Sequence, residues 1–257
     1  MRGIVLWSRN AVFAGHARSS DFIGVIPLCS EGLDTSRPVI LAIRGAFAPF
    51  DQLSWLGAQL PEAEVVVAHL PGLIGPLPEA VSIQGFANAF RELIETIYAG
   101  RQVVVVGASI GGLVALSLNS DRVKGVVAID PPLSTAKLWP LRDWAETARP
   151  ALSVAHQEWL WRILGYGPKV EDRCYDSVIE NLKRHAHVIV AGVALHPRRN
   201  LASMPGLLDA ADIALLRSHP LLTVRVAREA GHDVATEHPS LLLNTIREAL
   251  TPLQGTQ

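Results

Sequence analysis

Residues 103–118 constrain the fold of this chain more than any other part of the sequence. They open with four consecutive valines at positions 103–106. An unbroken run of β-branched residues is typical of a strand that is buried on both faces of a parallel sheet. The sequence Gly107-Ala-Ser-Ile-Gly-Gly112 follows, and then a small apolar segment, residues 113–118, that favours a helix. The stretch therefore predicts a strand, a tight turn and a helix that meet at Ser109.

The glycines around Ser109 give this serine its chemical interest. Gly107 and Gly111 have no Cβ, so a strand and a helix can approach closely, and the serine at the apex is held in a strained backbone with its Oγ exposed. The start of the helix offers free N–H groups and a partial positive charge, which suit a developing oxyanion. The bare five-residue pattern also fits an ordinary turn, but the valines before it and the helix after it favour a nucleophile elbow. A dinucleotide-binding loop is disfavoured, because these glycines do not space as G-x-G-x-x-G.

Composition disfavours several classes of protein. Apolar residues make up 49% of the 257 residues, as expected for one well-packed α/β domain with an insertion. The net charge is −1 and no Lys/Arg cluster stands out, so neither nucleic acid nor an anionic membrane is an expected partner. Cys29 and Cys174 lie far apart and form no disulfide framework or zinc motif. We recognise no signal peptide and no apolar run of membrane-spanning length, so we expect a cytoplasmic protein.

Hydrophobic periodicity predicts an antiparallel β start, followed from Pro38 by the strand–helix alternation of a parallel sheet. The expected strands are 4–7, 11–14, 22–28, 39–43, 65–68, 103–106, 123–129, 188–195 and 222–227. The expected helices are 51–60, 82–98, 113–118, 209–218 and 240–249. Asp51 and Ser82 are the expected N-caps of the first two helices.

Residues 133–186 differ from the rest of the chain and predict a helical insertion over the edge of the sheet. They carry four of the six tryptophans. Large aromatic side chains mostly serve packing, so some of these should fix the insertion to the core. The tryptophans expected to line a substrate pocket are Trp139, Trp144 and Trp159. The predicted organisation is a core of residues 1–132 and 187–257 and a helical lid of residues 133–186.

Several segments, taken in order, resemble the α/β-hydrolase superfamily over nearly the whole chain. His69-Leu-Pro-Gly72 looks like the D-L-P-G segment of that family, and residues 82–90 resemble the helix that usually follows it. Gly107-Ala-Ser-Ile-Gly111 matches the nucleophile elbow. Ala230-Gly-His-Asp-Val-Ala-Thr-Glu-His-Pro239 looks like the histidine loop. The resemblance implies the α/β-hydrolase fold, a mostly parallel central sheet with helices on both faces and a small helical lid.

The resemblance implies a serine nucleophile and a histidine base. Ser109 is a poor nucleophile at its free pKa and needs a base within hydrogen-bond reach. His232 follows the last expected strand and the flexible Gly231, so its ring can turn toward the serine. A loop histidine without a role is the competing interpretation, and the Gly-His-Asp context disfavours it. His69 also ends a strand, but a solvated loop residue is the favoured interpretation there.

Three aspartates compete for the acid of the triad. The family usually places it after the strand expected at 188–195, but residues 191–200 contain no carboxylate. The other position used in the superfamily is the end of the preceding strand, which here is Asp130, and open α/β sheets place functional groups at strand C-termini. Asp130 is favoured to orient His232 and stabilise its imidazolium, although it also fits a turn residue before two prolines. The alternatives are Asp209 and Asp212. Asp233 is adjacent to His232, so its side chain is expected to point elsewhere.

The oxyanion hole is expected to use backbone N–H groups of Ile110 and of Phe47 or Ala46. The last two residues lie in the loop after the strand at 39–43, where the family commonly has His-Gly and this chain has Arg44-Gly45. A backbone donor needs no particular side chain, so the hole can survive this difference. Arg44 either replaces a structural histidine packed inward, which is favoured, or reaches the pocket and pairs with an acidic substrate group.

These residues and the resemblance together imply hydrolysis of an ester or a thioester through an acyl-enzyme. The expected partner is a small-molecule substrate, and the tryptophan-rich insertion indicates that it has an apolar or aromatic part. No metal or organic cofactor is implied. C–C bond hydrolysis, acyl transfer and non-catalytic ligand binding stay as alternatives, because the fold does not decide the reaction.

Overall fold

Seven strands form one sheet in the order β1-β3-β2-β4-β5-β6-β7. The computed structural model describes residues 25–27, 36–49, 51–74, 77–193 and 206–254. Strands β2 to β7 run parallel, and β1 pairs antiparallel with β3. The strands are β1 (Val25–Pro27), β2 (Val39–Ile43), β3 (Glu64–Ala68), β4 (Val103–Ala108), β5 (Val123–Ile129), β6 (Ala186–Ala191) and β7 (Leu222–Ala227).

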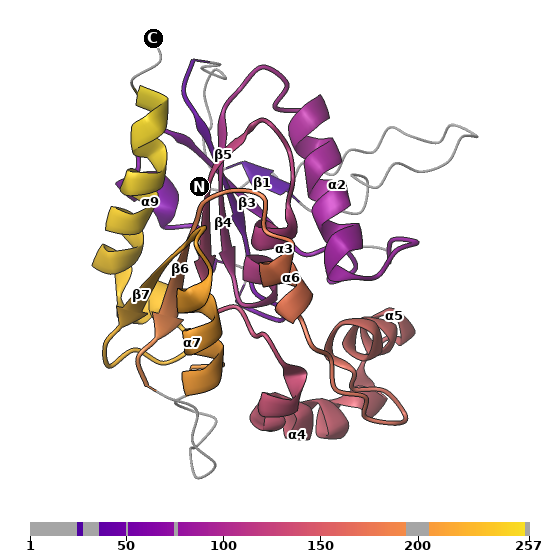
Figure 1. The fold of residues 1–257 in the computed structure, drawn as a ribbon. Coiled ribbons are helices and arrows are strands. Elements are labelled where there is room, and N and C mark those ends of the chain that lie inside the picture. The colour runs from indigo at the N-terminus through magenta and orange to yellow at the C-terminus, as the bar shows by residue number, and fades with distance from the viewer. Residues whose placement is uncertain (1–24, 28–35, 50, 75–76, 194–205, 255–257) are drawn as a thin grey trace, which may run out of the picture.

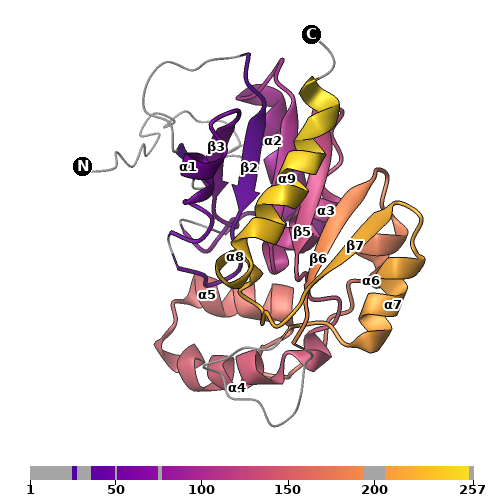
Figure 2. The same cartoon turned by 90° about the vertical axis from the view of Figure 1, so that its left-hand side faces the viewer.

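Helices cover both faces of the sheet (Figures 1 and 2). One face carries α2 (Ile83–Thr96), α3 (Ile110–Ser117), α6 (Asp176–Glu180) and α7 (Ala210–Ser218). The other carries α1 (Leu56–Gln59), α8 (Val234–Glu237) and α9 (Pro239–Gln254). Two further helices, α4 (Trp139–Ala148) and α5 (Val154–Trp159), lie beyond one end of the strands in both views. Every helix within the described ranges is too short or too polar to cross a bilayer.

The valine run of β4 is buried on both faces, as its composition predicts. Val103 and Val105 belong to the core on the α2/α3 side of the sheet, whereas Val104 and Val106 belong to the core on the α9 side. Successive side chains of a strand point to opposite faces, so each half of the run is covered by a different helical layer. Strand β4 thereby fixes Ser109, at its end, to the centre of the sheet.

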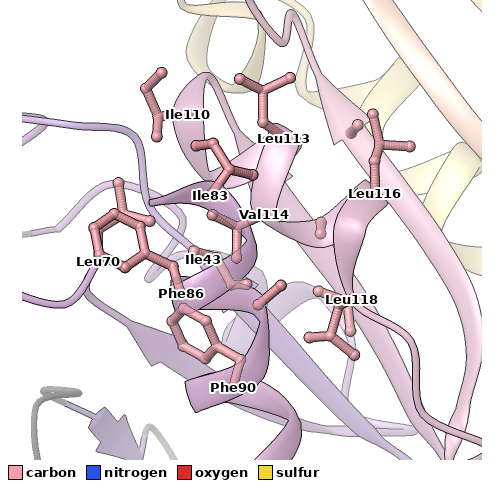
Figure 3. Close-up of a cluster of buried hydrophobic side chains, with 14 of the residues drawn as sticks. Ile43, Leu70, Ile83, Phe86, Phe90, Ile110, Leu113, Val114, Leu116 and Leu118 are labelled. Carbon is pink, nitrogen blue, oxygen red and sulfur yellow. The ribbon is translucent and has the colours of Figure 1, made fainter. Parts of the chain in front are cut away.

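The helix expected after Ser82 forms and packs its apolar face as predicted. Ser82 is the N-cap, and its Oγ accepts a hydrogen bond of 3.0 Å from the N–H of Gly85. Phe86 and Phe90 of α2 lie among side chains of α3, including Val114 (Figure 3). Full burial of each such side chain stabilises the fold by about 1.5–3 kcal/mol.

Most predicted strands are confirmed, with small shifts at their ends. The strands at 39–43, 123–129 and 222–227 coincide with β2, β5 and β7. The prediction of 188–195 was wrong in its bounds. Strand β6 begins at Ala186, whose N–H donates to the carbonyl of Leu221, and it ends at Ala191, after which Gly192 donates to Ala227. The predicted strands 4–7 and 11–14, and residues 194–195, lie outside the described residues.

The helix predicted at 51–60 is much shorter, and Asp51 is not its N-cap. Residues 51–55 form turns, α1 begins only at Leu56, and its N-cap position is Trp55, without a side-chain hydrogen bond. The reason is Leu53, which is fully buried and has a φ of 68°. A right-handed helix cannot contain a residue with positive φ.

The remaining predicted helices form with shifted ends. Helix α3 begins at Ile110, directly after the serine, three residues before the predicted start. Helix α7 follows Asp209, and α9 extends the predicted 240–249 to Pro239–Gln254.

The insertion at 133–186 is helical, and its two ends are held together. The N–H of Thr135 donates to the carbonyl of Arg173, and that of Tyr175 donates to the carbonyl of Leu133. The hydroxyl of Tyr166 bonds to two carbonyls, including that of Thr135 at 3.2 Å. Helix α6, at the end of the insertion, contacts α3 and joins the core. The role of the insertion as a lid stays a prediction.

Candidate active site

Ser109 occupies a strained turn between β4 and α3. Its φ is 54° and its ψ is −123°, a conformation that residues with a side chain rarely adopt. Its neighbours must be small, because a Cβ on Gly107 would lie 2.1 Å from the carbonyl oxygen of Gly111. The N–H of Ser109 donates to the carbonyl of Ile129 on β5, at 2.8 Å. This is the geometry expected of a nucleophile elbow.

Asp130 and His232 meet although they are far apart in the sequence. Asp130 directly follows β5, has a φ of 43° and is fully buried. Its Oδ2 lies 2.8 Å from Nδ1 of His232, whose side chain is 20% exposed. A carboxylate at this distance accepts the Nδ1 proton, which leaves Nε2 to accept a proton from another group. Parallel strands end at the same edge of the sheet, so β5 and the loop after β7 bring the pair together.

Backbone N–H groups complete the surroundings of the Asp130 carboxylate. Oδ1 accepts from the N–H of Ala191 at 3.1 Å, and Oδ2 accepts from that of Leu207 at 2.9 Å. Ala191 ends β6, where the resemblance places the acid in most of the family. In this chain that position supplies an N–H donor to a carboxylate from β5. Such charge-assisted hydrogen bonds offset the cost of burying the charge.

A cavity of about 360 Å³ lies beside Ser109 and His232. The loop after β2 forms one wall, because a Cβ on Gly45 would lie only 3.4 Å from the Cβ of Ser109. The N–H of Gly45 donates to Oε1 of Gln52 at 2.9 Å. The lining consists of Gly45, Ala46, Ala48, Pro49, Asp51, Gln52, Leu53, Trp55, Ser109, His232, Asp233, Ala235 and Thr236. Among the described residues, no group of three or more His, Cys, Asp or Glu side chains is placed to hold a metal ion.

Residues 40–245 match the model of the Alpha/beta hydrolase family. This protein belongs to that family. The match includes the serine, the aspartate and the histidine of the site, and the family consists mostly of hydrolytic enzymes. No curated protein sequence matches the chain.

Solved structures with this fold share little sequence with this α/β hydrolase. The N-formylmaleamic acid deformylase of Pseudomonas putida S16 is 17% identical, with a TM-score of 0.57, over 88% of this chain and 95% of that chain. A thermophilic esterase from Thermogutta terrifontis is 19% identical, with a TM-score of 0.59, over 89% and 92%. MenH from S. aureus is 12% identical, with a TM-score of 0.58, over 91% and 99%. At these identities the likeness concerns the fold alone.

Of the three residues expected to supply oxyanion donors, one is among those that line the cavity. Ile110 is the first residue of α3, and the intrahelical bonds begin after it, with Gly112 donating to the carbonyl of Ser109. Ala46 lines the cavity. Phe47 has a φ of 57°, and its ring packs against Trp159 with 5.5 Å between the ring centroids.

Arg44 of this α/β hydrolase packs inward, as the favoured interpretation has it. It is 4% exposed and is not among the lining residues. Nη1 donates to Nδ1 of His69, and Nη2 donates to the carbonyls of Ala48 and Pro49. Burial lowers the pKa of Arg44, and the nearby charge of Asp51 opposes this effect. The guanidinium holds the loop after β2 through these two carbonyls. These contacts do not support the other interpretation, in which Arg44 binds the substrate.

His69 is buried, so the expectation of a solvated loop residue was wrong. It is 5% exposed and accepts from Arg44. Burial and, to a smaller extent, the positive charge of Arg44 together lower the pKa of His69 to about 4. The ring is therefore neutral near pH 7 and serves as a hydrogen-bond acceptor.

Of the three tryptophan candidates of the insertion, only the side chain of Trp159 is described, and it is not at the cavity. Trp159 is fully buried, stacks on Phe86 with 6.2 Å between centroids, and donates from Nε1 to the carbonyl of Pro71 at 3.1 Å. It is a core residue, so its assignment to the pocket was wrong. Trp139 and Trp144 belong to α4, and their side chains lie outside what the structure describes. Among the described residues, Trp55 is the tryptophan that lines the cavity, and no sequence motif selects it.

Asp209 and Asp212 have other partners than His232. Asp209 is the N-cap of α7 and forms a capping box with Asp212. Both carboxylates bind Nζ of Lys137 at 2.8 Å. The hydrogen bond from Lys137 is the main reason why the pKa of Asp209 is lowered. Within the described ranges, His232 contacts Asp130 and neither of these two.

Glu237 holds the histidine loop. Its Oε2 accepts from the N–H of Gly231 at 2.9 Å. The N–H of Ala230 donates to Ala227, and Val193, after β6, donates to the carbonyl of Ala230. Glu237 lies in the segment that resembles the histidine loop of the family, and this contact gives it a structural role.

Proposed function

We propose that this protein is a serine hydrolase that cleaves an ester or a thioester of a small, partly apolar substrate through an acyl-enzyme. One observation carries the proposal. Ser109, with its φ of 54°, and His232 line the same cavity, and Nδ1 of His232 lies 2.8 Å from the buried carboxylate of Asp130.

The chemistry follows from the protonation of His232. Ser109 Oγ attacks the carbonyl carbon while Nε2 of His232 takes its proton, and Asp130 stabilises the resulting imidazolium through Nδ1–H. The tetrahedral intermediate collapses, the leaving group receives the proton from Nε2, and the acyl group stays on the serine. A water molecule then attacks the acyl-enzyme with His232 as the base, which releases the acid and restores the serine.

The negative charge of each tetrahedral intermediate needs fixed donors. We assign this role to the backbone N–H of Ile110, at the start of α3, together with that of Ala46 or Phe47. The partial positive charge of the helix N-terminus adds to these donors. The side chain of Arg44 takes no part, because it is directed to His69 and to loop carbonyls.

The cavity suits a small substrate with apolar parts. Its volume of about 360 Å³ is near the lower end of the range for small-molecule sites. Its apolar lining includes Leu53, Trp55 and Ala235. Two sequence features favour the alternative of non-catalytic ligand binding: residues 191–200 lack a carboxylate for the triad, and position 44 is an arginine. The contact of Asp130 with His232 and the inward position of Arg44 weaken both reasons.

Labelling with a fluorophosphonate probe tests the proposal. Wild-type protein should label covalently and hydrolyse short p-nitrophenyl esters, and Ser109→Ala should do neither while keeping the wild-type circular dichroism spectrum. A folded wild type that does not label, or a Ser109→Ala variant that labels equally, would contradict the proposal.

A further inference from the structure

The cavity beside Ser109 carries two carboxylates in its described lining and no lysine or arginine. The carboxylates belong to Asp51 and Asp233, and the remaining polar side chains are neutral apart from the titratable His232. Asp51 lies in the turns before α1, and Asp233 directly follows His232. Two unrelated segments therefore place negative charge on the same cavity.

The charge of Asp233 is the less compensated of the two. Asp233 is exposed, stands at the N-cap position of α8 without a side-chain capping bond, and has no ion pair within the described part of the chain. Asp51 lies close enough to the buried Arg44 for the two charges to interact. Arg44 thus offsets part of the field of Asp51, whereas the field of the exposed Asp233 is weakened mainly by solvent.

The cavity is small enough for both carboxylates to act on whatever binds in it. A sphere of its volume, about 360 Å³, has a diameter of about 9 Å, close to the Debye length of about 8 Å at physiological ionic strength. A charged group bound there is incompletely screened from either carboxylate. Trp55 adds an aromatic ring to the same lining, and such rings attract cations over their faces.

We propose that the substrate of this site carries a cationic ammonium group near its scissile carbonyl. The inference rests on the proposed hydrolase function, because it assigns that site a substrate class. The carboxylates of Asp233 and Asp51 would attract the cation, and Trp55 would contact its apolar substituents. The same charges would disfavour anionic substrates.

A matched pair of esters tests the inference. The p-nitrophenyl ester of 4-(trimethylammonio)butanoate carries a permanent positive charge, and that of 5,5-dimethylhexanoate has the same shape with carbon in place of nitrogen. We expect wild-type kcat/KM to be about tenfold higher for the cationic ester at low salt, and the ratio to fall as salt is added. A ratio of one or less at low salt would overturn the inference.

Neutralising single carboxylates locates the effect. Asp233→Asn should lower the cationic-to-neutral ratio most, and Asp51→Asn less, because Arg44 already offsets Asp51. Glu95→Gln is the matched control, since Glu95 is exposed on α2, away from the lining residues. Each ratio compares two substrates on one variant, so a change in His232 or in the folded fraction cancels. An equal change in all three variants would contradict a local origin.

The experiment separates this inference from the proposed function. If Ser109 labels and both esters are hydrolysed at equal rates, the cation preference is wrong and the hydrolase proposal stands. If nothing is labelled or hydrolysed, the hydrolase proposal fails. In that case the preference of the cavity for a cation is measured by binding, as the ratio of the Kd values of the two esters for Ser109→Ala. Equal Kd values would overturn the cation preference.

Discussion

The two walls of the cavity are held in different ways. On one wall, His232 is fixed by polar contacts: Asp130 binds it, and backbone N–H groups of β6 and of Leu207 bind Asp130. On the other wall, the loop after β2 is held by the buried Arg44 and by the packing of Phe47 on Trp159. The wall with His232, here called the base wall, depends on hydrogen bonds around Asp130. The wall formed by the loop after β2, here called the loop wall, depends on packing against a helix of the insertion.

Because of this difference, substitutions on the two walls should impair the protein in different ways. A change on the base wall removes a charge or a proton acceptor and leaves the packed core nearly intact. A change on the loop wall removes core packing, so the free energy of unfolding falls together with kcat.

Asp130→Asn should give the largest loss of activity. An amide at this position no longer fixes the His232 tautomer or stabilises the imidazolium, and we expect kcat for p-nitrophenyl acetate to fall by about a thousandfold to ten-thousandfold with little change in KM. Asp209→Asn is the control, because Asp209 caps α7 and binds Lys137. Strong activity in Asp130→Asn together with its loss in Asp209→Asn would assign the acid to Asp209.

Trp159→Leu should give the largest loss of stability. Trp159 is fully buried, and its ring contacts Phe47 and Phe86. Truncation of such a residue to alanine costs about 3–5 kcal/mol of unfolding free energy, and leucine, which refills part of the space, should cost about the lower end of this range. Trp159→Phe keeps a ring but leaves the carbonyl of Pro71 without its donor, at about 1–3 kcal/mol. In both variants kcat should fall more than KM rises, because the loop that carries Phe47 loses its support.

The control for this change is Trp161→Phe. Trp161 lies in the same part of the insertion but is only half-buried, with the guanidinium of Arg162 over its ring at 4.5 Å. We expect urea denaturation and steady-state kinetics close to those of the wild type. Equal losses of kcat in the Trp161 and Trp159 variants would show that the insertion does not act through Phe47.

His69 should make the stability of the protein depend on pH in a definite window. Burial lowers its pKa in the folded state to about 4, below the value of about 6.5 in an unfolded chain. Between these two values the unfolded state binds more protons than the folded state, so the unfolding free energy falls as the pH falls. The stability that the neutral His69 contributes is complete above pH 6.5 and is lost as the pH falls toward 4, by up to about 3 kcal/mol. The unfolding free energy, measured by urea denaturation across this range, should change more steeply with pH for the wild type than for His69→Gln. Equal slopes would rule out the buried neutral histidine.

Lys137→Met should have the smallest effect. Lys137 joins the insertion to Asp209 and Asp212 of the α7 cap, but its side chain is 27% exposed, and ion pairs near the surface contribute about 1 kcal/mol or less. We expect the unfolding free energy to fall by no more than that, and kcat to stay unchanged. A large fall in kcat would mean that this ion pair positions Leu207 against Asp130.

The base wall was largely predictable from the sequence. The valine run placed Ser109, and the rule that functional groups gather at strand C-termini selected Asp130 without a carboxylate after β6. His232 followed from its position after the last strand. All three follow strands of the parallel sheet, and hydrophobic patterns indicate that such strands exist even where their exact ends differ, as they do for β6.

Most contacts of the loop wall could not be predicted from the sequence, because they join residues that no local pattern connects. His69 looked solvated, but its partner Arg44 lies 25 residues earlier in the chain and buries it. The sequence favours Trp159 as a pocket residue, but its ring stacks on that of Phe86 in the core. Gln52 and Trp55 were hidden within an expected helix that the positive φ of Leu53 interrupts.

Trapping the acyl-enzyme tests the central claim most directly. With p-nitrophenyl acetate under rapid mixing, we predict a burst of p-nitrophenol equal to the enzyme concentration, and an acetyl group that peptide mass spectrometry finds on Ser109. Turnover of the ester without any adduct, or an adduct on another residue, would contradict the account.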